Sequence, residues 1–250
     1  MQDGKDEGRT ARQNKGRIAR QGQCQDHTEV MEIIREEKQM ALLDANTAQQ
    51  IRKIFEQMKE NVKVVLVTGK SNCETCDDTI AFAKEMTELS GKLSLELVED
   101  GQERAKELNV VMVPALVLLD KDGKDHGIKF YGIPAGHEIN SFLTGILEVS
   151  GVGQELPLTM TTQIMNIDKP VDIKVFVTLG CPHCPGAVSK AHKLALMNKN
   201  IQAEMIEANT FGEMSAKYNV SGVPKIVFND KEELLGDQPL EAFVNMMRNL

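Results

Sequence analysis

The strongest constraint on the fold of this 250-residue chain is that one pattern occurs in it twice. Two Cys-x-x-Cys motifs, Cys73–Cys76 and Cys181–Cys184, each follow an apolar run and precede a segment with helical spacing. A Val-Pro pair follows each motif, at Val113-Pro114 and at Val223-Pro224. Cys181 comes 108 residues after Cys73, and Pro224 comes 110 residues after Pro114. Landmarks that keep such a constant offset indicate a tandem duplication of one structural unit.

The hydrophobic periodicity of each copy predicts the order strand, helix, strand, helix, strand, strand, helix. The strands of the first copy are expected at 62–68, 93–98, 115–119 and 128–131, and those of the second at 171–178, 201–206, 225–228 and 232–235. Two helices are expected before the first copy, at 28–43 and 47–60, and one between the copies, at 159–165. Within each copy, one helix should follow the Cys-x-x-Cys motif and a short one the second strand. The last helix of each copy is expected at 137–149 and at 240–249. This alternation predicts an α/β fold, in which each copy has a central mixed β-sheet flanked by helices.

The composition divides the chain into three parts. Residues 1–28 are rich in Gln, Arg, Gly and Asp and hold few apolar side chains, so we expect a disordered N-terminal extension. Residues 29–150 would form an N-terminal domain with the first motif, and residues 151–250 a C-terminal domain with the second. A short linker is expected at 150–153 between them.

The four motif cysteines are the candidate catalytic residues: Cys73, Cys76, Cys181 and Cys184. A helix N-terminus has free N–H groups and a partial positive charge, so it stabilises a nearby thiolate, which is the nucleophile in disulfide exchange. A C-x-x-C motif between a strand and a helix indicates thioredoxin-like redox chemistry. The fifth cysteine, Cys24, has no counterpart in the repeat.

The two Val-Pro pairs complete the candidate active sites. Proline cannot donate a hydrogen bond to a sheet, so each should head its strand or adopt a special conformation. An X-Pro bond reaches the cis form at a cost of only about 0.5–1 kcal/mol. We expect Pro114 and Pro224 to be cis and to lie beside their dithiols. Val113 and Val223 would then present backbone groups to an extended substrate.

With these motifs in place, the chain resembles the two-domain protein disulfide oxidoreductases of the thioredoxin and glutaredoxin superfamily. The resemblance covers roughly residues 42–250, and its most specific stretches are 131–138, 176–185 and 218–227. It implies two thioredoxin folds, two redox dithiols that exchange with protein disulfides, and no bound cofactor. It also implies electrons from an NAD(P)H-dependent flavoprotein thioredoxin reductase. A similar tandem forms the N-terminal part of bacterial peroxiredoxin reductases, which makes a peroxiredoxin a plausible partner.

Acidic side chains surround the first dithiol. Glu74 lies inside the motif, and Asp77 and Asp78 follow it directly. Their carboxylates oppose the ionisation of a nearby thiol, although they also complement the dipole of the following helix. We therefore expect Cys73 and Cys76 to form the more reducing or electron-relaying pair.

The second dithiol has no acid in its motif or in the following turn. It has Pro182, which sets a helical φ, and His183, whose ring stabilises a nearby thiolate. These residues predict that Cys181 has the lower pKa and is the main nucleophile. Cys184 would then resolve the mixed disulfide.

One feature of single-domain thioredoxins is missing. They carry a buried acid six residues before the first cysteine, where this chain has Val67 and Val175. The neighbouring predicted strands offer Glu96 and Glu204, which could accept the proton of the second cysteine. Placement on the surface of a strand is an equal alternative. His137 and His192 are expected to be exposed or to cap a helix.

Composition excludes several other classes of function. The net charge of −8 and the absence of Trp argue against a nucleic-acid binder, and no apolar run approaches the ~20 residues that span a bilayer. We expect a cytoplasmic protein, where paired cysteines are more often catalytic than structural.

Two alternatives from other classes stay open at this point. Paired C-x-x-C motifs also bind zinc or iron–sulfur clusters, although zinc ribbons space them more closely. The chain could also be an interaction module without redox activity. The direction of catalysis, whether reduction, formation or isomerisation of disulfides, is not determined by these residues.

Overall fold

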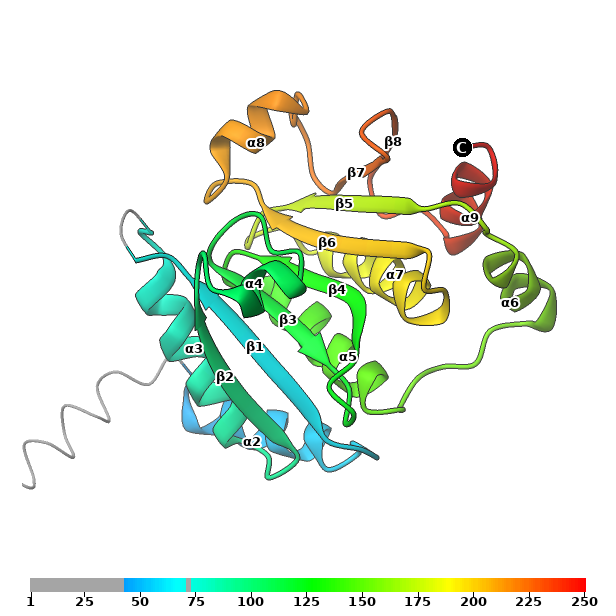
Figure 1. The fold of residues 1–250 in the computed structure, drawn as a ribbon. Helices are drawn as coiled ribbons and strands as arrows, with labels where there is room; N and C mark the ends of the chain where they lie inside the picture. The colour runs from blue at the N-terminus through cyan, green and yellow to red at the C-terminus, as the bar shows by residue number, and fades with distance from the viewer. Residues whose placement is uncertain (1–42, 71–72) are drawn as a thin grey trace, which may run out of the picture. The chain divides into compact units, whose positions relative to one another are not determined.

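One eight-stranded mixed sheet organises the described part of the chain, residues 43–70 and 73–250 of a computed structural model (Figure 1). The strand order is β2-β1-β3-β4-β6-β5-β7-β8. The first half contributes β1 (Val62–Thr68), β2 (Leu93–Glu99), β3 (Ala115–Leu119) and β4 (Asp125–Tyr131). The second half contributes β5 (Val171–Val177), β6 (Ile201–Glu207), β7 (Lys225–Phe228) and β8 (Glu232–Leu235).

The two halves repeat the same pairing. In the first, β1 pairs in parallel with β2 and antiparallel with β3, which pairs antiparallel with β4. In the second, β5 has the same relation to β6 and β7, and β7 pairs antiparallel with β8. This arrangement confirms the predicted α/β class with two thioredoxin-like folds, each with a mixed sheet flanked by helices.

The two four-stranded sheets join at their edges. Strands β4 and β6 pair in parallel, from Ile128 opposite Ala203 to Tyr131 opposite Ile206. An unpaired edge exposes a row of N–H and C=O groups, and this pairing covers one such edge in each half. The duplication therefore produces one continuous sheet rather than two separate ones.

Helices cover both faces of this sheet. Side chains of α2 (Ala45–Phe55), α3 (Cys76–Glu88), α5 (Ile139–Val149), α6 (Leu158–Met165), α7 (Cys184–Met197) and α9 (Leu240–Arg248) belong to the core on one face. The short helices α4 (Glu103–Glu107) and α8 (Gly212–Lys217) lie over the other face, where two smaller apolar clusters form. A 3₁₀ turn, η1 (Gly136–Glu138), precedes α5.

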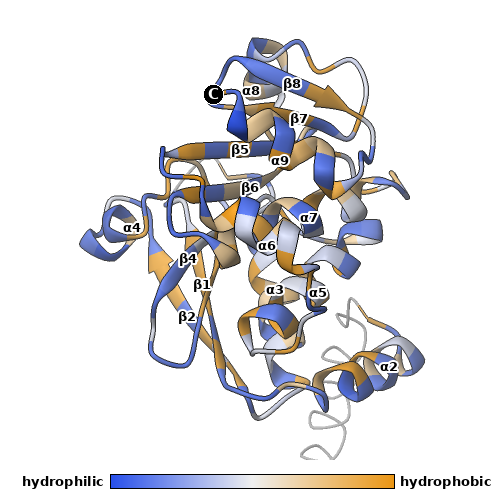
Figure 2. Cartoon of the chain, turned by 90° about the vertical axis from the view of Figure 1, so that its right-hand side faces the viewer, coloured by the Kyte–Doolittle hydropathy of each residue, from blue (hydrophilic) through white to orange (hydrophobic). Residues whose placement is uncertain are grey.

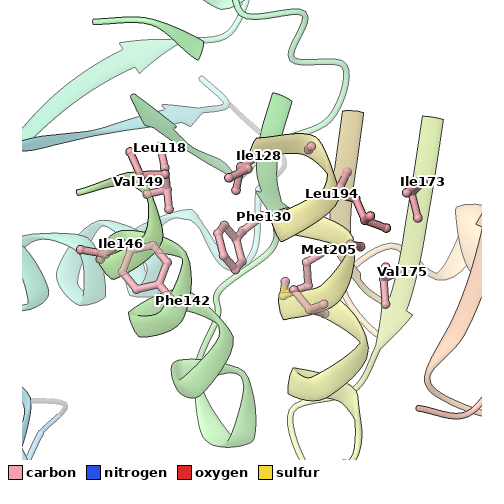
Figure 3. Close-up of a cluster of buried hydrophobic side chains, with 14 of the residues drawn as sticks. Leu118, Ile128, Phe130, Phe142, Ile146, Val149, Ile173, Val175, Leu194 and Met205 are labelled. Carbon is pink, nitrogen blue, oxygen red and sulfur yellow. The ribbon is translucent and has the colours of Figure 1, made fainter. Parts of the chain in front are cut away.

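The main core crosses the junction between the halves. Phe130 of β4 packs edge-to-face on Phe142 of α5, with ring centroids 5.3 Å apart, and Val175 of β5 and Leu194 of α7 belong to the same cluster (Figure 3). Between α5 and α7, the Lys193 ammonium pairs with Glu148 at 2.8 Å. The two thioredoxin-like folds thus share one hydrophobic core.

His192 corrects one expectation. The sequence predicts an exposed or capping side chain, but it is 1 % exposed and its ring packs on Phe130, with centroids 4.6 Å apart. It lies on the inward face of α7 with Val188 and Ala195, one turn away on either side. Burial lowers the pKa of His192 to about 3, so the side chain is neutral. His137 is exposed, as expected.

The helix expected at 47–60 is shorter than its pattern suggests. Asp44 caps α2 by accepting hydrogen bonds from the backbone N–H groups of Asn46 and Thr47, and the helix ends at Phe55. Met58, which the periodicity places in the helix, lies in the turn that follows, where it is still buried. The turn buries Met58 in the core, as a continued helix would, so the periodicity of apolar residues cannot distinguish the turn from a helix. Figure 2 shows hydrophilic and hydrophobic residues alternating along α2.

The remaining expectations concern the N-terminal residues, the domain boundary and membrane spans. The disordered extension at 1–28, most of the helix at 28–43 and Cys24 lie outside the described residues. The expected boundary at 150/151 falls between α5 and α6, and residues 43–250 form one compact unit. Among the described helices, none has the length and apolar character needed to cross a membrane.

Candidate active sites

Both dithiols lie at the same end of the sheet, where strands β1 and β5 terminate. Strands β1 and β5 run in the same direction, and each motif follows the carboxyl end of its strand. Four interstrand steps separate the two strands, from β1 through β3, β4 and β6 to β5. At about 4.8 Å a step, the strand ends are about 19 Å apart. The four cysteines therefore do not form one ligand set, and the two dithiols are separate sites.

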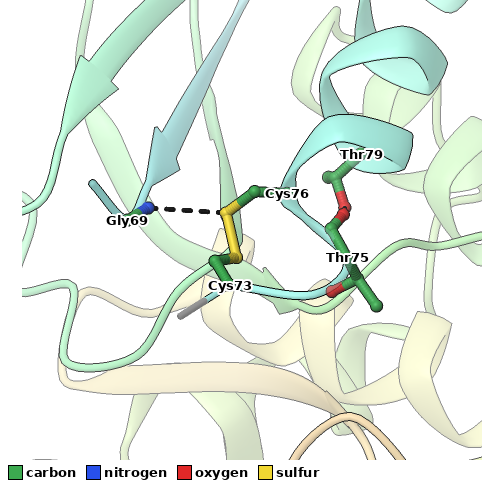
Figure 4. Close-up of a disulfide and its surroundings, with 5 residues drawn as sticks. All are labelled: Gly69, Cys73, Thr75, Cys76 and Thr79. Atoms are coloured by element: carbon green, nitrogen blue, oxygen red, sulfur yellow. Dashed lines mark hydrogen bonds between the residues drawn. A yellow bond between two sulfur atoms is a disulfide. The ribbon is translucent and has the colours of Figure 1, made fainter. Parts of the chain in front are cut away.

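The first site is a disulfide between Cys73 and Cys76, with Cα atoms 5.4 Å apart (Figure 4). Helix α3 begins at Cys76, which is 6 % exposed, and the backbone N–H of Gly69 donates to its Sγ at 3.4 Å. Cys73 precedes the helix and is half-buried. The accessible sulfur is therefore that of Cys73.

The second site repeats this arrangement. Cys181 and Cys184 form a disulfide with Cα atoms 5.5 Å apart, and α7 begins at Cys184. Cys184 is fully buried, whereas Cys181 is half-buried. The Sγ atom of Cys181 lies 3.8 Å from the carbonyl oxygen of Val223, the residue before Pro224.

Both Val-Pro bonds are cis, as predicted. In the second site, the contact of Val223 with Cys181 places the pair beside the dithiol. In the first, Val113 and Pro114 line the same cleft as Cys73, which has a volume of about 710 Å³. Both cis Val-Pro pairs thus lie beside the first cysteine of their motif.

The residues expected to tune the thiols differ in their placement. Glu74, Asp77 and Asp78 are exposed around the first motif. His183 is exposed at the N-cap position of α7. Pro182 lies in the turn before this helix, and the proline inside the first helical turn is Pro185.

Glu96 and Glu204 lie across the sheet from the dithiol helices. Successive strand residues point to opposite faces, so Glu96 lies on the α4 face with Val98, whereas Leu95 lies on the face of the main core. Glu96 forms ion pairs with Lys63 and Arg104. Glu204 likewise shares the α8 face with Ile206, whereas Met205 faces α7.

Burial raises the pKa of Glu204 to about 7, and Asp172 adds to this, while Lys129 and Lys174 oppose it. Glu204 thus belongs to a cluster of charged side chains at the junction of the halves, in which Glu204 and Lys129 are buried.

A buried carboxylate on the other face was not predicted. Glu138 of η1 is fully buried, and burial raises its pKa to about 7, against a smaller lowering by the Ser141 hydroxyl. Among the described residues, its Oε1 has no hydrogen-bond partner. The stretch 131–138 contributed to the family resemblance, but nothing in its pattern indicated that Glu138 is buried at a site.

The turn that carries Glu138 is fixed to the second motif. The backbone N–H of His137 donates to the carbonyl oxygen of Leu179 at 2.9 Å, two residues before Cys181. Gly136 has φ +57°, and a Cβ atom there would lie 2.5 Å from the same oxygen. η1 also packs against α7, which begins at Cys184. The turn that carries Glu138 is therefore bonded to the second motif and packs on the helix that begins at Cys184.

Comparison with known proteins agrees with this architecture. Residues 171–248 match the thioredoxin domain family. The AhpF component of alkyl hydroperoxide reductase from Staphylococcus aureus is 30% identical over 191 residues, which are 76% of this chain and 35% of that protein. The chain therefore spans about a third of the length of the curated relatives that it matches.

Two solved structures have the same fold over most of the chain. The AhpF protein of Enterococcus faecalis, also from an alkylhydroperoxide reductase, has a TM-score of 0.77 at 29% identity and covers 82% of this chain and 99% of the solved one. A protein disulfide oxidoreductase of Aeropyrum pernix has a TM-score of 0.76 at 28% identity and covers 84% and 95%. Both similarities extend across the two halves rather than one.

Proposed function

We propose that this chain, a two-domain thioredoxin-fold disulfide oxidoreductase, exchanges disulfides with proteins chiefly through Cys181. The observation that makes Cys181 the attacking sulfur is the difference in burial within its dithiol, and the absence of an acid in its motif and in the following turn favours it over Cys73. Cys181 is half-buried beside the Val223 carbonyl, whereas Cys184 is fully buried behind it. A substrate disulfide can therefore meet Cys181 but not Cys184.

In the reducing direction, the Cys181 thiolate attacks one sulfur of a substrate disulfide, and the other substrate sulfur leaves as a thiolate. The Cys184 thiolate then attacks Cys181 Sγ and releases the second substrate sulfur. Two electrons pass to the substrate, and the Cys181–Cys184 disulfide remains. The reverse sequence forms a disulfide, so the direction depends on the redox poise of the compartment. Val223 and Pro224 would hold the extended substrate during both steps.

Glu138 is a candidate proton acceptor for this site. A buried Cys184 thiol must lose its proton before it attacks, and an acceptor works best when its pKa lies near the working pH. Burial brings the pKa of Glu138 to about 7. Because the sheet separates Glu204 from α7, and Glu96 from α3, we favour Glu138 for this role.

The first dithiol acts as a separate site in this proposal. A sulfur–sulfur bond is about 2 Å long, whereas the two strand ends are about 19 Å apart. Electrons would therefore pass between the sites on a carrier such as a substrate protein, and not by direct exchange. The carboxylates of Glu74, Asp77 and Asp78 disfavour the Cys73 thiolate, which supports a more reducing couple there.

The similarity to the AhpF proteins of alkyl hydroperoxide reductases supports a more specific second role. The chain would relay electrons from an NAD(P)H-dependent flavoprotein, of the thioredoxin reductase kind, to a peroxiredoxin. Thiols kept ready for exchange suit the reducing cytoplasm, where we place this activity.

Insulin reduction by dithiothreitol tests whether Cys181 is the main nucleophile, with Cys181→Ser and Cys73→Ser as matched variants. We expect Cys181→Ser to lose most of the activity and Cys73→Ser to keep most of it. Alkylation rate against pH should give the lower apparent pKa at Cys181. Full activity of the Cys181→Ser protein, or a lower pKa at Cys73, would contradict the assignment.

A further inference from the structure

The cleft at the first dithiol has walls from both halves of the chain. Cys73 and the Val113-Pro114 pair form one wall, and the other is the segment 209–214 with Lys217, which includes most of α8. No sequence pattern connected α8 with the first motif, because more than 130 residues separate Cys73 from Phe211. The second half therefore helps to form the substrate surface of the first site.

Specific contacts hold this second wall in place. Tyr131 packs edge-to-face on Phe211, with ring centroids 6.1 Å apart, and its hydroxyl accepts the backbone N–H of Val111 at 3.3 Å. One buried side chain thus connects the start of the Val113-Pro114 loop to the entry of α8.

The start of α8 is also tied to the sheet. The carboxylate of Glu207, at the end of β6, accepts the Thr210 backbone N–H at 2.6 Å and the Thr210 hydroxyl at 2.7 Å. Gly132 lies so close that a Cβ atom there would come within 2.8 Å of Glu207 Cβ. These contacts make the cleft a fixed feature of the junction between the halves.

The charges in the cleft favour one kind of substrate. Glu74 and Glu213 line opposite walls, and Asp77 and Asp78 follow on the first turn of α3. The ammonium of Lys217 is directed to its neighbour Tyr218, 4.8 Å from the ring centroid and 3.3 Å from the hydroxyl. An acidic cleft attracts positively charged groups and raises their rate of association.

We propose that the Cys73 site takes extended, cysteine-containing protein segments with Lys or Arg beside the cysteine, and that α8 selects them. Apolar residues of such a segment would pack on Met112, Phe211 and Met214, while its basic groups meet Glu74 and Glu213. This inference rests on the proposed dithiol exchange and adds that the two sites prefer differently charged substrates. The second site lacks an acid in its motif and in the first turn of α7, and the carboxylate of Asp237, which lies against Gly186 of that turn, is paired with Lys190 at 2.5 Å.

The exchange itself follows the same balanced steps as at the second site. The Cys73 thiolate attacks the substrate disulfide and expels one substrate thiolate. The Cys76 thiolate then attacks Cys73 Sγ and expels the other, which leaves the Cys73–Cys76 disulfide. An external dithiol restores the reduced pair.

Two disulfide-linked peptide dimers test the preference, with the same apolar residues but either Lys or Glu on both sides of the cysteine. The first site is isolated in the Cys181→Ser/Cys184→Ser protein, and the second in Cys73→Ser/Cys76→Ser, with dithiothreitol as reductant. We expect the first site to reduce the Lys peptide about tenfold faster than the Glu peptide at low salt. Salt should shrink this ratio, because it screens exposed charges.

Charge reversal on α8 provides the decisive comparison. Glu213→Lys should remove most of the preference of the first site, whereas Glu241→Lys on α9, an equal charge change away from the cleft, should keep it. The same preference at the second site, or an equal effect of both substitutions, would assign it to the net charge and overturn the inference. Equal rates with both peptides would also overturn it while leaving dithiol exchange intact. Failure to reduce either peptide would refute exchange at the first site and the inference with it.

Discussion

Gly136 offers a direct test of how the first half supports the second dithiol. Its φ of +57° lies in the left-handed region, and an alanine Cβ there would lie 2.5 Å from the Leu179 carbonyl oxygen. Gly136→Ala therefore carries two costs. The backbone conformation costs about 1–2 kcal/mol for a residue with a Cβ atom. Displacing Leu179 also breaks the hydrogen bond from the His137 N–H, which is worth about 1 kcal/mol.

We expect Gly136→Ala to lower the free energy of unfolding by about 2–3 kcal/mol in a urea titration. The matched control is Gly101→Ala, because Gly101 has φ +84° and nothing within 4 Å of its would-be Cβ. The control carries only the backbone cost, so the difference between the variants isolates the contact with Leu179.

The functional consequence should be confined to one site. Leu179 lies two residues before Cys181, so its displacement moves the second motif while leaving β1 and the first motif in place. Peptide reduction should slow at the isolated Cys181 site and stay unchanged at the isolated Cys73 site. If Gly136→Ala matched Gly101→Ala in stability and in both rates, the supposed support of the second motif by η1 would be refuted.

Three further predictions follow from buried groups. His192 stays neutral to about pH 3 in the folded state but binds a proton near pH 6.5 in the unfolded state, so acid destabilises the fold. In urea titrations, the free energy of unfolding of His192→Leu should rise by about 2.5 kcal/mol relative to wild type as the pH falls from about 7.5 to 4.5. A difference between the two proteins that does not change with pH would contradict the burial of His192. Glu138 stays protonated to about pH 7 when folded but ionises near 4.5 when unfolded, so the folded state loses stability as pH rises through this window. Glu138→Gln should gain stability relative to wild type there, and reduction at the isolated Cys181 site should fall about a hundredfold; an unchanged rate would exclude Glu138 as proton acceptor. Glu207→Ala should lower the free energy of unfolding by about 1–3 kcal/mol and slow peptide reduction only at the Cys73 site. Glu207→Gln keeps one acceptor oxygen, so its losses in the urea titration and in the peptide assay should be smaller.

The repeated motif was sufficient to predict the architecture of each half. Period-two and helical spacing are local properties, so strands such as β1, β3, β7 and β8 end where the pattern ends. The constant offset of the Cys-x-x-Cys and Val-Pro pairs predicted two dithiols with adjacent cis prolines, because chemistry at a strand end needs those residue types at that spacing. Charge near each motif is also local, and it supplied the expected asymmetry between Cys73 and Cys181.

What the sequence did not determine is how the two halves meet. Nothing local to β4 or β6 records that these two edges pair, because an edge strand has the same pattern whichever partner it has. That pairing buries His192 of α7 against Phe130 of β4, fixes the Glu138 turn against Leu179, and brings α8 to the Cys73 cleft. Each of these contacts joins residues far apart in the chain, so only long-range packing decides it. The sequence by itself thus determined the two dithiols and their folds, and the tertiary structure decided which distant groups surround each of them.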